Sequence, residues 1–206
     1  MIGTKVLEEV TSKFNGQLKV VKTFGMGTYI QAGGLTQSGG IVESIWKSTL
    51  RQIKSDNKNI LVLGLGGGTL GKLLRKKYPD AKITGIEIDP LMIELGKRYL
   101  NLDEYNVDIK ILDVNKLKFK DKSQDLIIVD MYQGDSFPKV FESDKFLNKL
   151  KNTLKENGIL VINRLYFGEK RPDTVRFGNK LEKIFSKVKW YYPEANLMFI
   201  INNQNE

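Results

Sequence analysis

Three glycines at alternating positions follow a short apolar run in the first third of the chain. The run Ile60–Leu63 ends directly before Gly64, and Gly66 and Gly68 follow at intervals of two. Glycine has no Cβ, so the backbone there can turn sharply and a ligand can touch it closely. A helix that begins after such a loop adds unsatisfied N–H groups. The spacing therefore predicts a loop that binds a nucleotide-like cofactor.

Two acidic residues stand at the ends of the next two expected strands. Glu87 ends the strand Lys82–Glu87, where a carboxylate can accept hydrogen bonds from both hydroxyls of a ribose. A dinucleotide and an S-adenosyl cofactor both fit these features. Asp113 follows Ile109–Leu112, where a methyltransferase-like fold places a residue against the adenine amino group. A dinucleotide fold more often has a second mononucleotide half, so we favour an S-adenosyl sulfonium.

A further carboxylate follows the expected strand Leu126–Val129. In open α/β sheets, side chains just past the carboxyl ends of strands line the ligand crevice. Asp130 is therefore predicted to be catalytic and to contact the cofactor, because it can position an amine, accept its proton or offset a sulfonium charge. A turn or helix-capping aspartate is the alternative interpretation.

Several neighbouring residues are weaker candidates for a substrate site. For the aromatic ones a place in the core is the alternative, and for Asp135 it is an ordinary turn. The predicted substrate-binding residues are Trp46, Tyr132, Gln133 and Asp135. Asn163 and Arg164 follow the fifth expected strand and are further candidates to face the crevice.

The composition excludes several kinds of chemistry and partner. The 206 residues include no histidine and no cysteine, which rules out Ser-His-Asp and Cys-His mechanisms, disulfides and the usual zinc sites. We expect no metal. The net charge is +9, but the lysines are spread without a dense block, so we do not expect a nucleic-acid partner.

Neither a membrane span nor a signal peptide is visible in the sequence. No apolar run approaches the roughly 20 residues that a span requires. The first ten residues lack a continuous apolar segment. We therefore expect a cytoplasmic protein without a membrane partner.

Apolar strands alternate with helices from Asn59 onward. This pattern predicts a parallel sheet covered on both faces. The short connection between Val188–Tyr192 and Leu197–Ile201 predicts an antiparallel pair at the sheet edge. Together they predict an α/β, Rossmann-like class I methyltransferase fold, with a mostly parallel seven-stranded sheet that ends in an antiparallel C-terminal hairpin.

The first forty residues have a different pattern. Gln17–Lys22 and Thr28–Gln31 are β-prone and are separated by a glycine-containing turn, which predicts a hairpin. A helix is expected from Val42 to Ile53. We therefore predict a small β-region over residues 1–40 and a Rossmann-like cofactor-binding catalytic domain over residues 41–206.

The chain resembles the spermidine synthase (polyamine aminopropyltransferase) family, within the class I S-adenosylmethionine-dependent methyltransferase-like superfamily. The segments that carry the resemblance are Leu63–Thr69, Glu87-Ile88-Asp89, Ile128-Val129-Asp130, and Val6–Glu9, Leu18–Val21, Tyr29-Ile30 and Gln37 of the β-region. The resemblance implies that an amine takes an aminopropyl group from decarboxylated S-adenosylmethionine, which leaves methylthioadenosine. It also implies that Gln37 and Glu87 contact the cofactor, Asp113 the adenine and Asp130 the attacking amine. A homodimer formed partly through the β-region is implied as well.

The acceptor positions differ from the pattern of that family. Gly33-Gly34 replaces an acidic residue followed by glycine, Trp46-Lys47-Ser48 replaces Tyr-His-Glu, and Gln133 replaces a second aspartate. A dicationic diamine needs carboxylates that offset its charge. We therefore expect an altered acceptor, either a small amine or another small molecule.

Two alternative functions stay open. One is methyl transfer from intact S-adenosylmethionine, which leaves S-adenosylhomocysteine; Lys47 is then a candidate to bind the α-carboxylate. The other is a non-catalytic homologue that binds the cofactor or a partner without turnover.

Overall fold

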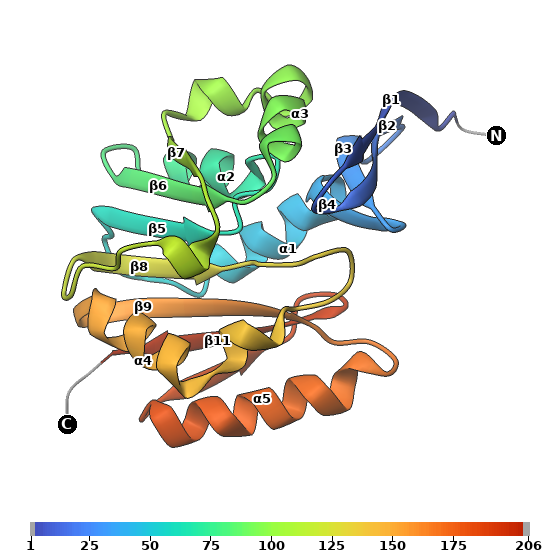
Figure 1. The fold of residues 1–206 in the computed structure, drawn as a ribbon. Coiled ribbons are helices and arrows are strands. Elements are labelled where there is room, and N and C mark those ends of the chain that lie inside the picture. Colours follow the sequence, from blue (N-terminus) through green and yellow to red (C-terminus); the bar gives the residue numbers. More distant parts are fainter. Residues whose placement is uncertain (1–2, 204–206) are drawn as a thin grey trace.

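Residues 3–203, which the computed structural model describes, form two β-sheets of different connectivity (Figure 1). A four-stranded sheet has the order β1-β2-β3-β4 and a seven-stranded sheet has the order β10-β11-β9-β8-β5-β6-β7. The strands are β1 (Lys5–Ser12), β2 (Gly16–Thr23), β3 (Gly27–Ala32), β4 (Leu35–Gly39), β5 (Asn59–Leu63), β6 (Lys82–Glu87), β7 (Asp108–Ile111), β8 (Gln124–Val129), β9 (Leu154–Leu165), β10 (Val188–Tyr191) and β11 (Asn196–Asn202). The helices are α1 (Gly40–Leu50), α2 (Thr69–Lys77), α3 (Pro90–Leu100), α4 (Asp144–Thr153) and α5 (Lys170–Ile184), with the short 3₁₀ helices η1 (Leu102–Tyr105), η2 (Val114–Lys116) and η3 (Lys139–Glu142).

The large sheet confirms the predicted fold class. Strands β5, β6, β7, β8 and β9 pair in parallel, and β11 runs antiparallel to both of its neighbours, β9 and β10. The predicted C-terminal hairpin is therefore present, with β10 at the edge and β11 inside the sheet. Because β11 lies between two strands, nearly all of its residues are buried.

Alternating side chains of the central strand enter two separate cores. Ile60 and Val62 of β5 belong to the cluster that includes residues of α1 and α2. Leu61 and Leu63 belong to the cluster that includes residues of α4 and α5. Successive side chains of a strand point to opposite faces, so helices cover this sheet on both sides, as predicted.

The N-terminal sheet is larger than the predicted hairpin. The hairpin is present as β2 and β3, and β1 and β4 extend it to a four-stranded antiparallel sheet. Its apolar side chains, such as Leu18 and Ile30, pack against Met92 and Leu95 of α3. Figure 1 shows this sheet beside α1 and α3, at one end of the parallel sheet.

The division into two domains stays a prediction. Strand β4 ends at Gly39 and helix α1 begins at Gly40, two residues before the expected start. Residues 1–2 and 204–206 of the predicted domains lie outside the described residues. Within residues 3–203, no helix has both the length and the apolar character that crossing a membrane requires.

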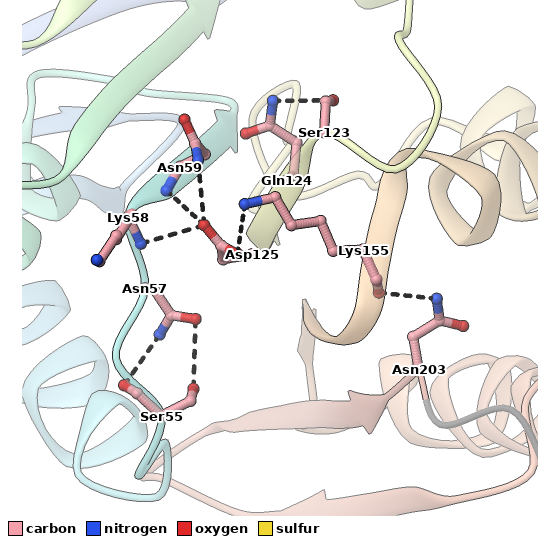
Figure 2. Close-up of polar contacts among 9 residues, drawn as sticks. All are labelled: Ser55, Asn57, Lys58, Asn59, Ser123, Gln124, Asp125, Lys155 and Asn203. Carbon is pink, nitrogen blue, oxygen red and sulfur yellow. Dashed lines mark hydrogen bonds and ion pairs between the residues drawn. The ribbon is translucent and has the colours of Figure 1, made fainter.

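A polar network joins the amino-terminal ends of β5 and β8 to β9 (Figure 2). The Oδ2 atom of Asp125 accepts hydrogen bonds from the backbone N–H groups of Lys58 (3.2 Å) and Asn59 (2.7 Å). Its Oδ1 atom lies 2.8 Å from the Nζ atom of Lys155. Partial burial raises the pKa of Asp125, but the donors from Lys155 and Asn59 outweigh it and lower the pKa. This carboxylate therefore stabilises the sheet at the edge opposite the carboxyl ends of the strands.

Candidate cofactor and acceptor site

The glycine-rich loop connects β5 to α2 and packs against the loop after β8. Gly64 has a φ of +86°, and a Cβ atom there would collide with the carbonyl oxygen of Asp130. The Asp130 N–H donates to the carbonyl oxygen of Leu63 at 2.8 Å. Only glycine permits both the backbone conformation and the close approach. The loop and the Asp130 backbone are thus held together at the carboxyl edge of the sheet.

Glu87 is buried beneath this loop, with 8% of its surface exposed. Its Oε1 atom accepts from the backbone N–H groups of Ile88 (2.9 Å) and Asp89 (3.0 Å), and its Oε2 atom accepts from Gly66 (2.8 Å). Burial raises the pKa of Glu87, and the three backbone donors act against that rise. Each carboxylate oxygen can accept about two hydrogen bonds, so Oε2 is the atom with capacity for a ribose hydroxyl.

Strand β4 is hydrogen-bonded to the glycine-rich loop on its other side. The Gly67 N–H donates to the Oγ atom of buried Ser38 at 2.7 Å. The Gly39 N–H donates to the Oγ1 atom of Thr69, the first residue of α2, also at 2.7 Å. The N-terminal sheet therefore fixes the loop that the sequence predicts to bind the cofactor.

Asp130 is mostly buried and is held by a donor at each carboxylate oxygen. The indole N–H of Trp46 in α1 donates to Oδ2 at 2.8 Å, and the side-chain amide of Asn163 in β9 donates to Oδ1 at 2.8 Å. The Asn196 amide in turn donates to Oδ1 of Asn163 at 2.8 Å. Burial raises the pKa of Asp130, while the bonds from Asn163 and Trp46 lower it. A buried carboxylate with a raised pKa is suited to accept a proton.

Tyr132 fixes the loop after β8 to β9. Its hydroxyl donates to the carbonyl oxygen of Asn163 (3.2 Å) and accepts from the N–H of Leu165 (2.8 Å). Its ring meets the ring of Phe137 edge-on, with 5.9 Å between centroids. Burial raises the pKa of the hydroxyl. Tyr132 therefore supports the wall that carries Asp130.

A cavity of about 390 Å³ lies at the carboxyl edge of the parallel sheet. It brings most of the predicted site residues together. Those that line it are Gln37, Trp46, Gly64, Gly66, Glu87, Asp113, Asp130, Tyr132, Gln133 and Asn163. Asp113 also caps η2 by accepting from the Asn115 N–H at 2.8 Å, and the Gln37 amide donates to the Gly134 carbonyl at 3.2 Å across the cavity wall. The sheet order places Asp130 and Asn163 on one side of β5, and Glu87 and Asp113 on the other.

Several residues named from the sequence do not line this cavity. Gly68 is the N-cap of α2, has a φ of +94° and packs against Leu102, so it shapes the loop from below. Asp135 is exposed and lies 2.6 Å from the Nζ atom of Lys170, which lowers its pKa. Lys47 is exposed on α1. The expectation that Asp135 and Lys47 face the substrate or cofactor is therefore not met by their placement.

Of the asparagines at the site, the sequence predicts only Asn163 to face the cavity. It does not identify Asn196, which holds Asn163 and, through Asn163, Asp130. Asn15 lines the cavity from the β1–β2 turn, where its amide donates to buried Asp89 at 2.7 Å. Single asparagines in a chain rich in Lys and Asn carry no sequence signal that separates them from surface residues. Arg164 points elsewhere: it pairs with Glu142 at 2.7 Å.

No potential metal cluster is present in the described part of the chain, where no three His, Cys, Asp or Glu side chains gather. Comparison with known proteins identifies a family for this chain. A family model described as a methyltransferase domain matches residues 54–197, more than half of the chain. The protein belongs to this methyltransferase domain family. The predicted transferase class is thereby confirmed.

Curated relatives of this methyltransferase-domain protein include two kinds of transferase. It is 29% identical over 172 residues to an eEF1A lysine and N-terminal methyltransferase homolog of Drosophila melanogaster, which covers 77% of this chain and 25% of the relative. It is also 29% identical over 112 residues to the polyamine aminopropyltransferase of Vibrio vulnificus, which covers 52% of this chain and 37% of that protein. The chain thus spans only 25% to 37% of the length of these relatives.

Solved structures share the fold of this methyltransferase-domain protein. The spermidine synthase of Thermotoga maritima aligns with a TM-score of 0.76 and 19% identity over 98% of this chain and 74% of that one. Human methyltransferase-like protein 13 in complex with SAH aligns with a TM-score of 0.59 and 21% identity over 81% of this chain and 80% of that one. The predicted resemblance to spermidine synthases therefore holds for the fold, N-terminal sheet included.

Proposed function

We propose that the protein transfers a methyl group from S-adenosylmethionine to an amine, with Asp130 as the catalytic residue. The observation that carries this proposal is the small amount of acidic charge at the Asp130 end of the cavity. Strand β4 and helix α1 contribute only uncharged side chains to the lining there, among them Thr36, Gln37 and Trp46. The loop after β8 contributes the uncharged residues Gln133 and Gly134 to the same lining.

The residues at the other end fit the nucleoside part of an S-adenosyl cofactor. Glu87 would bind the ribose through its Oε2 atom, and Asp113 would contact the adenine. Gly64 and Gly66 would leave room for the backbone to approach the ligand, with Gln37 above it. The human relative in complex with SAH supports a cofactor of this type.

Charge favours the intact cofactor over its decarboxylated form. The amino-acid end of S-adenosylmethionine is a zwitterion, which neutral donors and acceptors such as Gln37 and Asn15 can bind. The decarboxylated form ends in a lone ammonium in addition to its sulfonium, and a diamine acceptor adds two more positive charges. A low-dielectric cavity that holds these cations needs several carboxylates, whereas this end offers Asp130 and the exposed Glu194.

Asp130 would position the amine and accept its proton. When bound, the cofactor supplies an electrophilic methyl carbon whose C–S electron pair stays on sulfur. The amine nitrogen then forms the new N–C bond, and the proton that it loses passes to the Asp130 carboxylate. Trp46 and Asn163 hold that carboxylate in one orientation during the transfer.

Aminopropyl transfer is the second candidate. The 29% identity to a polyamine aminopropyltransferase over half of the chain favours it. The small-amine acceptor expected from the sequence belongs to this candidate, and so does the expected homodimer.

Calorimetric titration with four ligands tests the proposal. The ligands are S-adenosylmethionine, S-adenosylhomocysteine, decarboxylated S-adenosylmethionine and methylthioadenosine. We expect the two carboxylated ligands to bind at least about tenfold more tightly than the decarboxylated cofactor, a difference of about 1.4 kcal/mol. The opposite preference would favour aminopropyl transfer over methyl transfer. If none of the four ligands bound, both candidate functions would be refuted.

A further inference from the structure

Three large apolar side chains that line the cavity are also exposed to solvent. They are Ile41 (40% exposed), Val140 (50%) and Phe167 (36%), and they form what we call the apolar rim. Single exposed apolar side chains are common on protein surfaces. Three that line the same cavity mark a surface that a ligand covers.

The rim belongs to the Asp130 end of the cavity. Ile41 is on α1, the helix that carries Trp46. Phe167 follows β9, which carries Asn163, and Val140 is in η3, which follows the loop after Asp130. The three segments that hold the catalytic carboxylate thus also supply the rim. The charged ends of a diamine need carboxylates, so a diamine would gain little from contact with these apolar side chains.

The size of the cavity indicates where most of the acceptor lies. A volume of about 390 Å³ is at the lower end of the range for pockets that enclose one drug-sized ligand. An S-adenosyl cofactor that reaches from Asp113 to Asp130 therefore takes up most of it. The acceptor must reach Asp130 through a narrow group, and its remaining atoms lie outside, against the rim.

Basic side chains stand next to the rim. Lys139 precedes Val140 and is exposed. The Arg171 guanidinium lies over the ring of Tyr166, 5.4 Å from the ring centroid. Tyr166 directly precedes Phe167 in the sequence. The whole chain carries a net charge of +9. Glu169 and Glu194 are exposed there as well, but the net positive charge of the chain favours an acceptor that is acidic beyond its apolar contact.

We propose that the acceptor is a polypeptide segment whose primary amine enters the cavity and whose neighbouring apolar side chain packs on the rim. This inference rests on the proposed function and names its substrate class. The peptide amine, once neutral, forms the N–C bond to the methyl carbon while its proton passes to Asp130. The peptide beyond the apolar side chain passes the basic residues, where acidic side chains are preferred.

Radiolabelled methyl transfer to defined peptides tests this inference. The acceptors are synthetic twelve-residue peptides with one primary amine, either a free N-terminus or a single lysine. In one set Leu or Phe flanks the amine and Asp or Glu follows; in the other set Ser replaces the apolar residues. Putrescine and a single-stranded RNA oligonucleotide are the competing acceptors.

We expect the apolar peptides to have a kcat/KM at least about tenfold above that of the Ser peptides and of putrescine. The double variant Val140→Ser/Phe167→Ser should raise KM for the apolar peptides about tenfold and leave the affinity for S-adenosylmethionine unchanged. Phe24→Ser, at a solvent-exposed turn that does not line the cavity, is the matched control and should change neither.

Several results would overturn the inference. These are putrescine or RNA as the better acceptor, rim variants without effect on KM, and no transfer to any peptide by protein that binds S-adenosylmethionine. A failure of the proposed function is distinguishable, because it shows in the cofactor titration. Aminopropyl transfer to the apolar peptides, impaired by the rim variants, would support the acceptor class and refute only the methyl donor.

Discussion

At Asp130, burial and hydrogen bonding act on one carboxyl group in opposite directions. Burial raises its pKa, and donors from Asn163 and Trp46 lower it. As a base, the group works only when it is ionised. The acid limb of the activity profile therefore reports the pKa that results from this balance.

Trp46→Phe removes one of the two donors and leaves an apolar ring in its place. The pKa of Asp130 should rise further, so the acid limb of kcat/KM should move to higher pH, by about one unit for a charge-assisted bond of about 1.5 kcal/mol. A pH profile of methyl transfer measures this shift. Trp190→Phe is the matched control, because its indole N–H donates to the exposed Glu182. An unshifted limb in Trp46→Phe would mean that Asp130 is not the titrating base.

Glu87→Gln tests the ribose assignment. The amide places N–H atoms where backbone N–H groups now donate, and it removes the charge that a ribose hydroxyl would meet. We expect the Kd for S-adenosylmethionine to rise about 10- to 100-fold, a loss of about 1.4–2.7 kcal/mol, in calorimetric titration. Glu156→Gln, at an exposed position near the start of β9, is the control. Equal affinities for both variants would exclude Glu87 from the cofactor site.

Among the elements, the contact between β4 and the glycine-rich loop connects the two sheets. Ser38 and Gly67 form one of its hydrogen bonds, and Gly39 and Thr69 form the other. The N-terminal sheet therefore stabilises the loop in addition to packing on α3. Substitutions in β4 should therefore weaken binding at the proposed cofactor site.

Ser38→Ala leaves the buried Gly67 N–H without its acceptor. The free energy of unfolding should fall by about 1–2 kcal/mol, and S-adenosylmethionine should bind more weakly because the loop is less ordered. Urea denaturation and titration calorimetry measure the two effects, with exposed Ser44→Ala as control. A stable Ser38→Ala protein with unchanged affinity would show that β4 does not support the loop.

At the opposite edge of the sheet, Asp125 has a lowered pKa, so its contribution to stability depends on pH. The contribution is complete above the unfolded-state pKa near 3.9 and is lost as the pH falls through the lower folded-state pKa. Asp125→Asn should cost about 1–3 kcal/mol at pH 7, and its difference from the wild type should shrink below about pH 4. Thermal denaturation over this pH range measures the effect, and the exposed Asp121→Asn should show none. A pH-independent difference would mean that the charge of Asp125 contributes nothing.

The elements that the sequence predicts correctly are those with continuous apolar patterns. Ile60–Leu63 and the glycines after it identify the first parallel strand and its loop without knowledge of the fold. Strand β1 escapes notice because its side chains are only partly buried and it has a register shift between Val6 and Glu8. The bond between Trp46 and Asp130 joins residues 84 positions apart and depends on how α1 packs. Asp135 is predicted from the sequence to bind substrate, but in the structure it pairs with Lys170 of α5.

At the scale of the whole molecule, the cavity lies where the carboxyl ends of the parallel strands meet the N-terminal sheet. Glu87 and Asp113 follow β6 and β7 at the end where we propose that the nucleoside binds, and the Asp130 end is built on α1, β8 and β9. The methyl-transfer proposal depends on the small amount of acidic charge at the Asp130 end. Adding acid to the second end should therefore change which donor is preferred.

The most direct measurement identifies the products from both donors. The protein is incubated with S-adenosylmethionine or with decarboxylated S-adenosylmethionine, each with the peptide and diamine acceptors, and the nucleoside products are quantified by mass spectrometry. We expect S-adenosylhomocysteine from the first donor and little methylthioadenosine from the second. The variant Gln133→Asp should form more methylthioadenosine than the unaltered protein. Methylthioadenosine as the main product of the unaltered protein would contradict the assignment.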